Sequence, residues 1–207
     1  MKHTHSTVWL VLIAFMFAGY SENLIAGHTP LPPGNPFVKG PLKTFLVTPC
    51  RVFDTRNVLR LPPTATARKI ASGTEFHVKI RNSITNLPTN LKHQGGSSTG
   101  CGIPPNAVGV YLNLVAVEPN GPGAIVAYQY PTPPSLASTI NFAKGQIVAN
   151  MVVVALCDNK TSTCASDILV RVDGAASHLV GDVSGFLVGE PSPGCELQDS
   201  GYEVCIN

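Results

Sequence analysis

The feature that most constrains the fold is a series of short apolar runs, separated by turns, between about residues 43 and 189. The runs are rich in β-branched residues, and many of the chain's 19 glycines and 18 prolines lie between them. The run 75–80 alternates polar and apolar residues, as a half-buried strand does. The run 108–117 is apolar on both faces, as in a strand covered on both sides. Further runs lie at 42–48, 123–130, 138–143, 147–156, 167–172 and 177–188.

These runs predict an all-β protein. Their β-branched composition favours strands over helices, and no stretch combines apolar residues at helical spacing with helix caps. Eight or nine short strands with frequent turns are typical of a sandwich, a barrel or a jelly roll. We therefore expect an antiparallel β-sandwich or jelly-roll-like domain.

The N-terminal segment predicts export. Lys2 precedes an apolar run at residues 8–18, which is too short to cross a hydrocarbon core of ~30 Å as a helix. Small and polar residues follow, which is typical of a signal peptide cleaved after Gly19 or near Ala26. The alternative is an uncleaved membrane anchor. The predicted organisation is a signal peptide at 1–27, a Pro/Gly-rich linker at 28–42, a β domain at 43–189 and a disulfide-closed tail at 190–207, with no membrane span in the mature chain.

All six cysteines follow the predicted signal peptide, and an even number in an exported chain favours disulfides. One pair flanks a short polar loop between two apolar runs, and another encloses the tail, so each can close locally. The remaining pair is then the long-range bridge. The predicted pairs are Cys157–Cys164, Cys195–Cys205 and Cys50–Cys101, and the absence of a Cys-x-x-Cys sequence disfavours zinc or redox sites.

Four polar residues interrupt apolar runs: Asn113, Asn141, Asn150 and Asp182. A buried polar group is costly unless it is hydrogen-bonded, so such residues usually satisfy backbone groups at sheet irregularities or loop ends. The alternative is that they line a ligand cleft. We expect the structural role.

Asp54 and Arg56 lie two residues apart, shortly after Cys50, so in an extended chain their side chains share a face. Arginine can pair with a carboxylate through two hydrogen bonds. We therefore expect an ion pair between Asp54 and Arg56 or between Arg56 and Asp182. Together with the three asparagines, these residues form the predicted structural polar network.

The sequence contains one match to the G-x-S-x-G nucleophile pattern, at residues 96–100 with Ser98 at its centre. Asp173 and His178 follow in the order of a hydrolase triad. That mechanism needs a strand before the serine and a helix after it, but the flanking residues are rich in glycine and proline. We expect no catalytic site, and no histidine spacing indicates a metal or a cofactor.

Four segments carry a resemblance to a known family. They are PCRVFDTR (49–56), the segment 101–130 with its YLNLV sequence, STINFAKGQIVANMVVVAL (138–156) and HLVGDVSGFLV (178–188). Over about residues 43–188 the chain resembles a repeat-like domain of secreted bacterial proteins, a family mostly of undetermined function. The resemblance implies export, a β fold, the Cys50–Cys101 pair and no known catalytic residues. The chain departs from the family by its two other cysteine pairs and by Phe186, where tyrosine is common.

The leading functional hypothesis is a secreted, non-catalytic module for adhesion, binding or structure outside the cell or in its envelope. A net charge of +2 with scattered signs gives no nucleic-acid footprint, so we expect an extracellular or envelope partner. The alternative is a carbohydrate-binding module with a polysaccharide partner, because Tyr128 and Tyr130 share one face of a strand and could stack on sugars. Cross-strand packing explains the same pair equally well. A serine hydrolase using Ser98 is the third and weakest hypothesis.

Overall fold

The structure is a computed structural model that describes residues 41–58, 69–83, 87–159 and 163–205. The predicted signal peptide, 1–27, lies outside the described residues, as does the predicted linker except for its last two residues. No described helix has the length and apolar character needed to cross a membrane.

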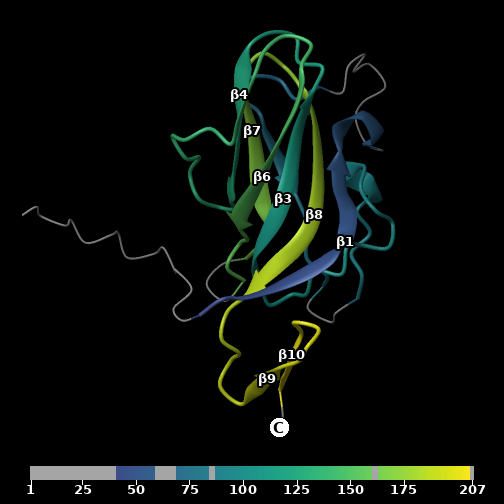
Figure 1. Ribbon diagram of the computed structural model, residues 1–207, viewed down its shortest axis with the longest axis vertical. Helices are drawn as coiled ribbons and strands as arrows, with labels where there is room; N and C mark the ends of the chain where they lie inside the picture. Colours follow the sequence, from purple (N-terminus) through teal and green to yellow (C-terminus); the bar gives the residue numbers. More distant parts are fainter. Residues whose placement is uncertain (1–40, 59–68, 84–86, 160–162, 206–207) are drawn as a thin grey trace, which may run out of the picture. The chain divides into compact units, whose positions relative to one another are not determined.

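Eight strands form two antiparallel sheets, and each of the eight predicted apolar runs contributes one strand (Figure 1). The first sheet has the order β1 (Lys43–Asp54), β8 (His178–Val188), β3 (Ala107–Val117) and β6 (Ile147–Ala155). The second has the order β2 (Glu75–Val78), β7 (Ile168–Gly174), β4 (Gly123–Gln129) and β5 (Ile140–Phe142). The predicted all-β sandwich is confirmed.

The strand order is that of a jelly roll. Strands β1 and β8, β2 and β7, β3 and β6, and β4 and β5 pair as in one long antiparallel ribbon. The ribbon is folded so that β8 also pairs with β3 and β7 also pairs with β4. This wrapping distributes the strands over two facing sheets of four, which is the jelly-roll arrangement.

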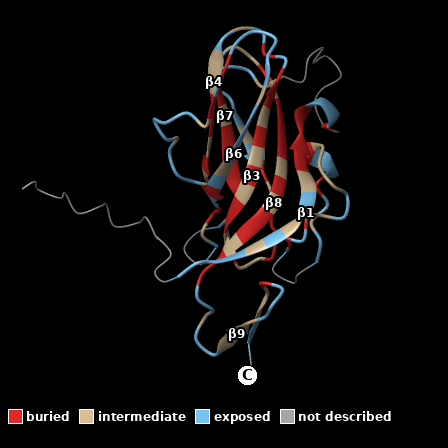
Figure 2. Cartoon of the chain, viewed as in Figure 1, coloured by how far each residue is buried: buried red, intermediate tan, exposed pale blue. Residues whose placement is uncertain are grey.

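The core lies between the two sheets, where their inner faces are buried (Figure 2). Leu112 and Leu114 of β3, Ile125 of β4 and Leu179 of β8 are fully buried there. Burial of one such side chain stabilises the fold by about 2 kcal/mol. The outer side chains of β3 are only half-buried, so the prediction that the run 108–117 is covered on both sides is wrong.

Strand β1 is longer and less regular than the sequence predicts. It passes Pro49 and continues to Asp54, with shifts in its register against β8 between Leu46 and Cys50 and again between Arg51 and Phe53. Proline is tolerated because β1 is an edge strand, where an N–H group need not bond to a neighbouring strand. The shifts change which side chains face outward.

The three predicted disulfides, Cys50–Cys101, Cys157–Cys164 and Cys195–Cys205, are all present. The first joins β1 to the long connection between β2 and β3, as the sequence predicts. The third closes a hairpin of β9 (Cys195–Leu197) and β10 (Glu203–Cys205), two short strands that the sequence analysis did not predict.

Candidate functional site

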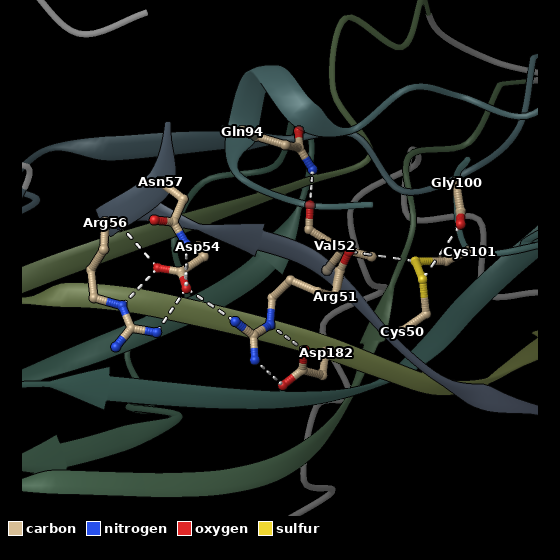
Figure 3. A network of polar contacts seen from close by, with 10 residues as sticks. All are labelled: Cys50, Arg51, Val52, Asp54, Arg56, Asn57, Gln94, Gly100, Cys101 and Asp182. Carbon is tan, nitrogen blue, oxygen red and sulfur yellow. Dashed lines mark hydrogen bonds and ion pairs between the residues drawn. A yellow bond between two sulfur atoms is a disulfide. The ribbon is translucent and has the colours of Figure 1, made fainter. Parts of the chain in front are cut away.

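Polar side chains gather where β1 meets β8 (Figure 3). At their centre is Asp54, which is the last residue of β1 and is 1% exposed. Its carboxylate accepts hydrogen bonds from the backbone N–H of Arg56 at 3.0 Å, from Nε of Arg56 at 2.9 Å and from Nη1 of Arg51 at 3.0 Å. Asn57 Nδ2 donates a further bond at 3.3 Å. A buried carboxylate with this many donors is fully satisfied.

The ionisation of Asp54 reflects two opposed effects. Burial acts to raise its pKa, but the hydrogen bonds from Arg56 and the positive charges of Arg56 and Arg51 hold the pKa below its ordinary value of 3.8. The hydrogen bond to Asp54 raises the pKa of Arg56, and the charge of Glu118 acts in the same direction. The pair is therefore ionised over the whole physiological range.

Arg51 is the second element of this network, and the sequence analysis missed it. Its Nε donates to Asp182 Oδ1 and its Nη2 lies 3.4 Å from Asp182 Oδ2, so the guanidinium links the carboxylates of Asp54 and Asp182. In a regular strand, residues three apart point to opposite faces. The register shift between Arg51 and Phe53 lets Arg51 and Asp54 share a face. The contact depends on the cross-strand register of Arg51 and Asp182, so no pattern in the sequence could have indicated it.

The two ion pairs proposed from the sequence have different outcomes. The Asp54–Arg56 pair is present, with Arg56 Nη2 2.7 Å from Asp54 Oδ2. It forms because Asp54 caps the 3-10 turn η1 (Thr55–Asn57), not because the chain is extended there. Asp182 pairs with Arg51 instead of Arg56, since Arg51 is its direct neighbour across the strands.

The three predicted network asparagines lie on three different strands, and two of them are exposed. Asn113 is half-buried on the outer face of β3, beside Asp182 in the register of β8. Asn141 on β5 and Asn150 on β6 are exposed, because both strands are sheet edges. Asn150 Nδ2 donates to the carbonyl of Thr139 at 2.9 Å, which matches the expected bond to the backbone.

The start of the G-x-S-x-G segment and the two residues before it lie against β1, which explains the glycines at 95 and 96. Ser97 N–H donates to the carbonyl of Arg51 at 2.9 Å, and Gln94 Nε2 donates to that of Val52 at 2.7 Å. A Cβ added at Gly96 would overlap the Val52 carbonyl, and one at Gly95 would overlap that of Asp54. The segment can approach β1 this closely only with glycine at both positions.

The three residues of the proposed triad have separate surroundings. Ser98 is exposed in the connection beside β1. Asp173 lies on β7 of the second sheet and pairs with Arg171 at 2.9 Å. His178 begins β8, with its Nδ1 3.5 Å from Thr55 Oγ1.

A further ion pair, also missed by the sequence analysis, lies deep in the fold. The side chains of Arg81 and Asp167 are 7% and 2% exposed and lie 2.8 Å apart. Asp167 also accepts the backbone N–H groups of Ile80 and Arg81, and Arg81 donates to the carbonyls of Ala107 and Cys157. The pair joins the segment after β2 to the ends of three other segments, so it organises one end of the sandwich.

The tyrosines proposed for sugar stacking lie on the outer face of the second sheet. Tyr128 is buried against Val126 and Leu169, and Tyr130 packs beside this cluster near the ring of His77. The phenol of Tyr128 donates to Glu75, and burial together with that carboxylate raises the pKa of Tyr128. Because its ring is covered, Tyr128 offers no exposed platform, and Tyr130 remains as the partly accessible aromatic.

Large apolar side chains remain exposed along β6. Ile147, Met151 and Val153 are 72%, 51% and 52% exposed, and Ala149 and Ala155 between and beyond them are exposed as well. We call these five residues the β6 stripe. The run 147–156 therefore forms a strand as predicted, but one apolar face of that strand has no cover among the described residues.

The described residues contain one group of side chains with metal-ligand spacing, Cys195, Glu203 and Cys205, whose two sulfurs are joined in a disulfide. Comparisons with protein-family models, with curated proteins and with solved structures find no match to this chain.

Proposed function

We propose that this chain is an exported, non-catalytic module that acts outside the cell or in its envelope, through adhesion, binding or structural assembly. The observation that carries the proposal is that the candidate charged side chains are paired, whereas large apolar side chains are exposed. The aspartates that the sequence analysis singled out pair with arginines, as in Asp54–Arg56, Asp182–Arg51 and Asp173–Arg171. Large apolar side chains stay exposed on a regular sheet strand. This distribution fits a rigid scaffold with a contact surface better than it fits a reaction site.

Three disulfides support export, because such bridges persist in oxidising compartments and are rare in the cytosol. The N-terminal segment that resembles a signal peptide supports the same conclusion. The resemblance to the repeat-like domain of secreted bacterial proteins adds to this, and we propose membership of that family.

The test has a catalytic arm and a binding arm. In the catalytic arm, the mature chain and its Ser98→Ala variant are compared on ester, amide and glycoside substrates. We expect equal background rates, and hydrolysis that Ser98→Ala abolishes would overturn the proposal. Ser98 is exposed, so the variant is a clean control.

In the binding arm, retention of the mature chain on sedimented envelope fractions and on a panel of insoluble polysaccharides is measured. Saturable retention on envelope fractions is expected. Binding to one polysaccharide that is lost in Tyr130→Ala, but not in Met151→Lys, would assign carbohydrate binding to the second sheet. The absence of saturable binding to any envelope or polysaccharide sample would count against the proposal.

A further inference from the structure

The edges of the two sheets differ in how they are protected. Exposed strand edges invite pairing with other chains, so proteins shorten, charge, bulge or cover them. Strand β5 has three residues and β2 has four, with Glu75 and His77 facing out. Strand β1 contains Pro49 and two register shifts, and the segment at Gln94–Ser97 bonds to its backbone. Each of these edges has a feature that hinders pairing.

Strand β6 has none of these features. It is nine residues long, pairs with β3 without any register shift, and contains neither proline nor a charged residue. It is the outermost strand of its sheet, next to β3 (Figure 1). Among the described strands it is the one long, regular edge that carries no protection.

The hydrogen-bond pattern fixes which backbone groups face outward. At the two ends of the ladder, Leu156 N–H donates to Val108 and Glu118 N–H donates to Gln146. Because the register does not shift between these points, the even-numbered residues of β6 bond to β3. The N–H and C=O groups of the β6 stripe therefore point away from the sheet. The same five residues carry the exposed apolar side chains, so the unpaired backbone groups and the exposed apolar side chains belong to one set of residues.

We propose that β6 pairs with β6 of a second copy of this chain, antiparallel and centred on Met151, which joins the two first sheets into one continuous sheet. In this register Met151 faces Met151, Ala149 faces Val153 and Ile147 faces Ala155. All five outward residues can then exchange both of their bonds, giving about ten hydrogen bonds across the two-fold axis. Shifting the register in either direction leaves outward groups of the stripe without partners.

The charges around β6 favour a second copy in this orientation. No charged residue lies between Lys144 and Asp158, and each of these two is seven residues from Met151. Antiparallel pairing brings the lysine end of one copy to the aspartate end of the other, whereas parallel pairing brings like charges together. The facing side chains are all apolar, so pairing buries no unpaired charge.

The first test is the oligomeric state of the full mature chain, measured by sedimentation over a dilution series. We expect a concentration-dependent dimer that Met151→Lys weakens by about tenfold or more, because two lysines would face each other at the axis. The matched control is Leu46→Lys, at a position that is 82% exposed on β1 of the same sheet. The control should leave the dimer intact. Both variants are checked for unchanged melting.

A charge-swap series tests the register. Ala149→Lys and Val153→Glu should each weaken the dimer, and the double variant should restore it, because position 149 of one copy faces position 153 of the other. A chain that is monomeric at every concentration would overturn the proposal. So would a dimer that Met151→Lys leaves unchanged, or a double variant that stays as weak as the single ones.

This inference rests on the proposed function and deepens it by naming one partner. The experiments distinguish failure of the dimer from failure of the proposed function. A monomeric wild type with saturable envelope binding removes the dimer and keeps the non-catalytic module. A β6 dimer with Ser98-dependent hydrolysis keeps the dimer and removes the proposed function.

Discussion

Arg51 lies directly opposite Asp182 in the pairing of β1 with β8, and its guanidinium also reaches Asp54, with Nη1 3.0 Å from Oδ2. One arginine therefore joins the carboxylate that ends β1 to a carboxylate in the middle of β8. This link fixes the edge strand β1 to the sheet at the point where its register is irregular. The network around Asp54 is thus expected to act mainly on stability.

The first prediction compares Asp54→Ala with Arg56→Ala. Asp54 is buried and caps η1, so its loss removes a cap and several charge-assisted hydrogen bonds, at a cost of about 2–4 kcal/mol. The side chain of Arg56 is 46% exposed, and Arg51 would still neutralise Asp54, so Arg56→Ala should cost about 1 kcal/mol. Urea unfolding with the disulfides intact measures both. Equal losses would contradict the central position of Asp54.

The second prediction concerns acid. The pKa of Asp54 is lowered in the folded state, so its contribution to stability is fully present above the ordinary value of 3.8 and is lost as the pH falls through the folded pKa. Unfolding free energies of the wild type and of Asp54→Asn are compared from neutral pH downward. Their difference should be constant near neutrality and should shrink below about pH 4. A difference that persists or grows in acid would show that the charge of Asp54 is not the stabilising feature.

The third prediction concerns the buried pair. Removing one partner of Arg81–Asp167 leaves a charge with little access to water, so Asp167→Ala should lower the unfolding free energy by about 3–5 kcal/mol. The double variant Arg81→Met with Asp167→Ala should be less destabilised than the sum of the single variants, because no charge then remains buried. Additive losses in this cycle would mean that the two side chains are not coupled.

Much of the sandwich could be predicted from the sequence, because strand formation depends on local patterns. The eight apolar runs each became one strand, and the spacing of the cysteines indicated all three bridges. The burial of individual side chains was harder to predict from the sequence. Asn141 and Asn150 lie in apolar runs much like Asn113, but they are exposed because β5 and β6 are edges. Strand order is set by long-range pairing, which no local pattern records.

The polar network was predictable only in part for a related reason. Asp54 and Arg56 are near neighbours in sequence, so their pairing is local and could be anticipated. Arg51 and Asp182 are 131 residues apart, and they meet through cross-strand register. Arg81 and Asp167 are likewise remote in the chain. Ion pairs that depend on cross-strand register and on a register shift can be identified only once the fold is known.

The fourth prediction separates the two readings of the G-x-S-x-G segment. Gly96→Ala would drive a Cβ into the Val52 carbonyl of β1, so it should destabilise the fold by about 2 kcal/mol or more. Ser98→Ala changes an exposed side chain and should alter the free energy of unfolding by no more than about 0.5 kcal/mol. Thermal melting of both variants gives the comparison. A Gly96→Ala protein as stable as the wild type would remove the structural explanation of the glycines.

The last prediction ranks the disulfides by what they connect. Cys50–Cys101 spans 51 residues and ties β1 to the segment that covers its edge. In the chain-entropy model, a loop of that length contributes about 4 kcal/mol. Cys195–Cys205 spans 10 residues and closes a hairpin outside the two four-stranded sheets.

Replacing both members of each pair by alanine avoids a free thiol and makes the comparison direct. In the Cys50→Ala, Cys101→Ala protein, the unfolding free energy should fall by most of the contribution of about 4 kcal/mol that the chain-entropy model assigns to this bridge. The Cys195→Ala, Cys205→Ala protein should lose less, because a loop of 10 residues contributes only about 2.5 kcal/mol in the same model. Contacts of the hairpin with the sandwich, such as the packing of Leu197 on the core and the bond from Asn82 to Tyr202, do not depend on this bridge. A larger loss from the tail pair than from the long-range pair would mean that the hairpin supports the sandwich.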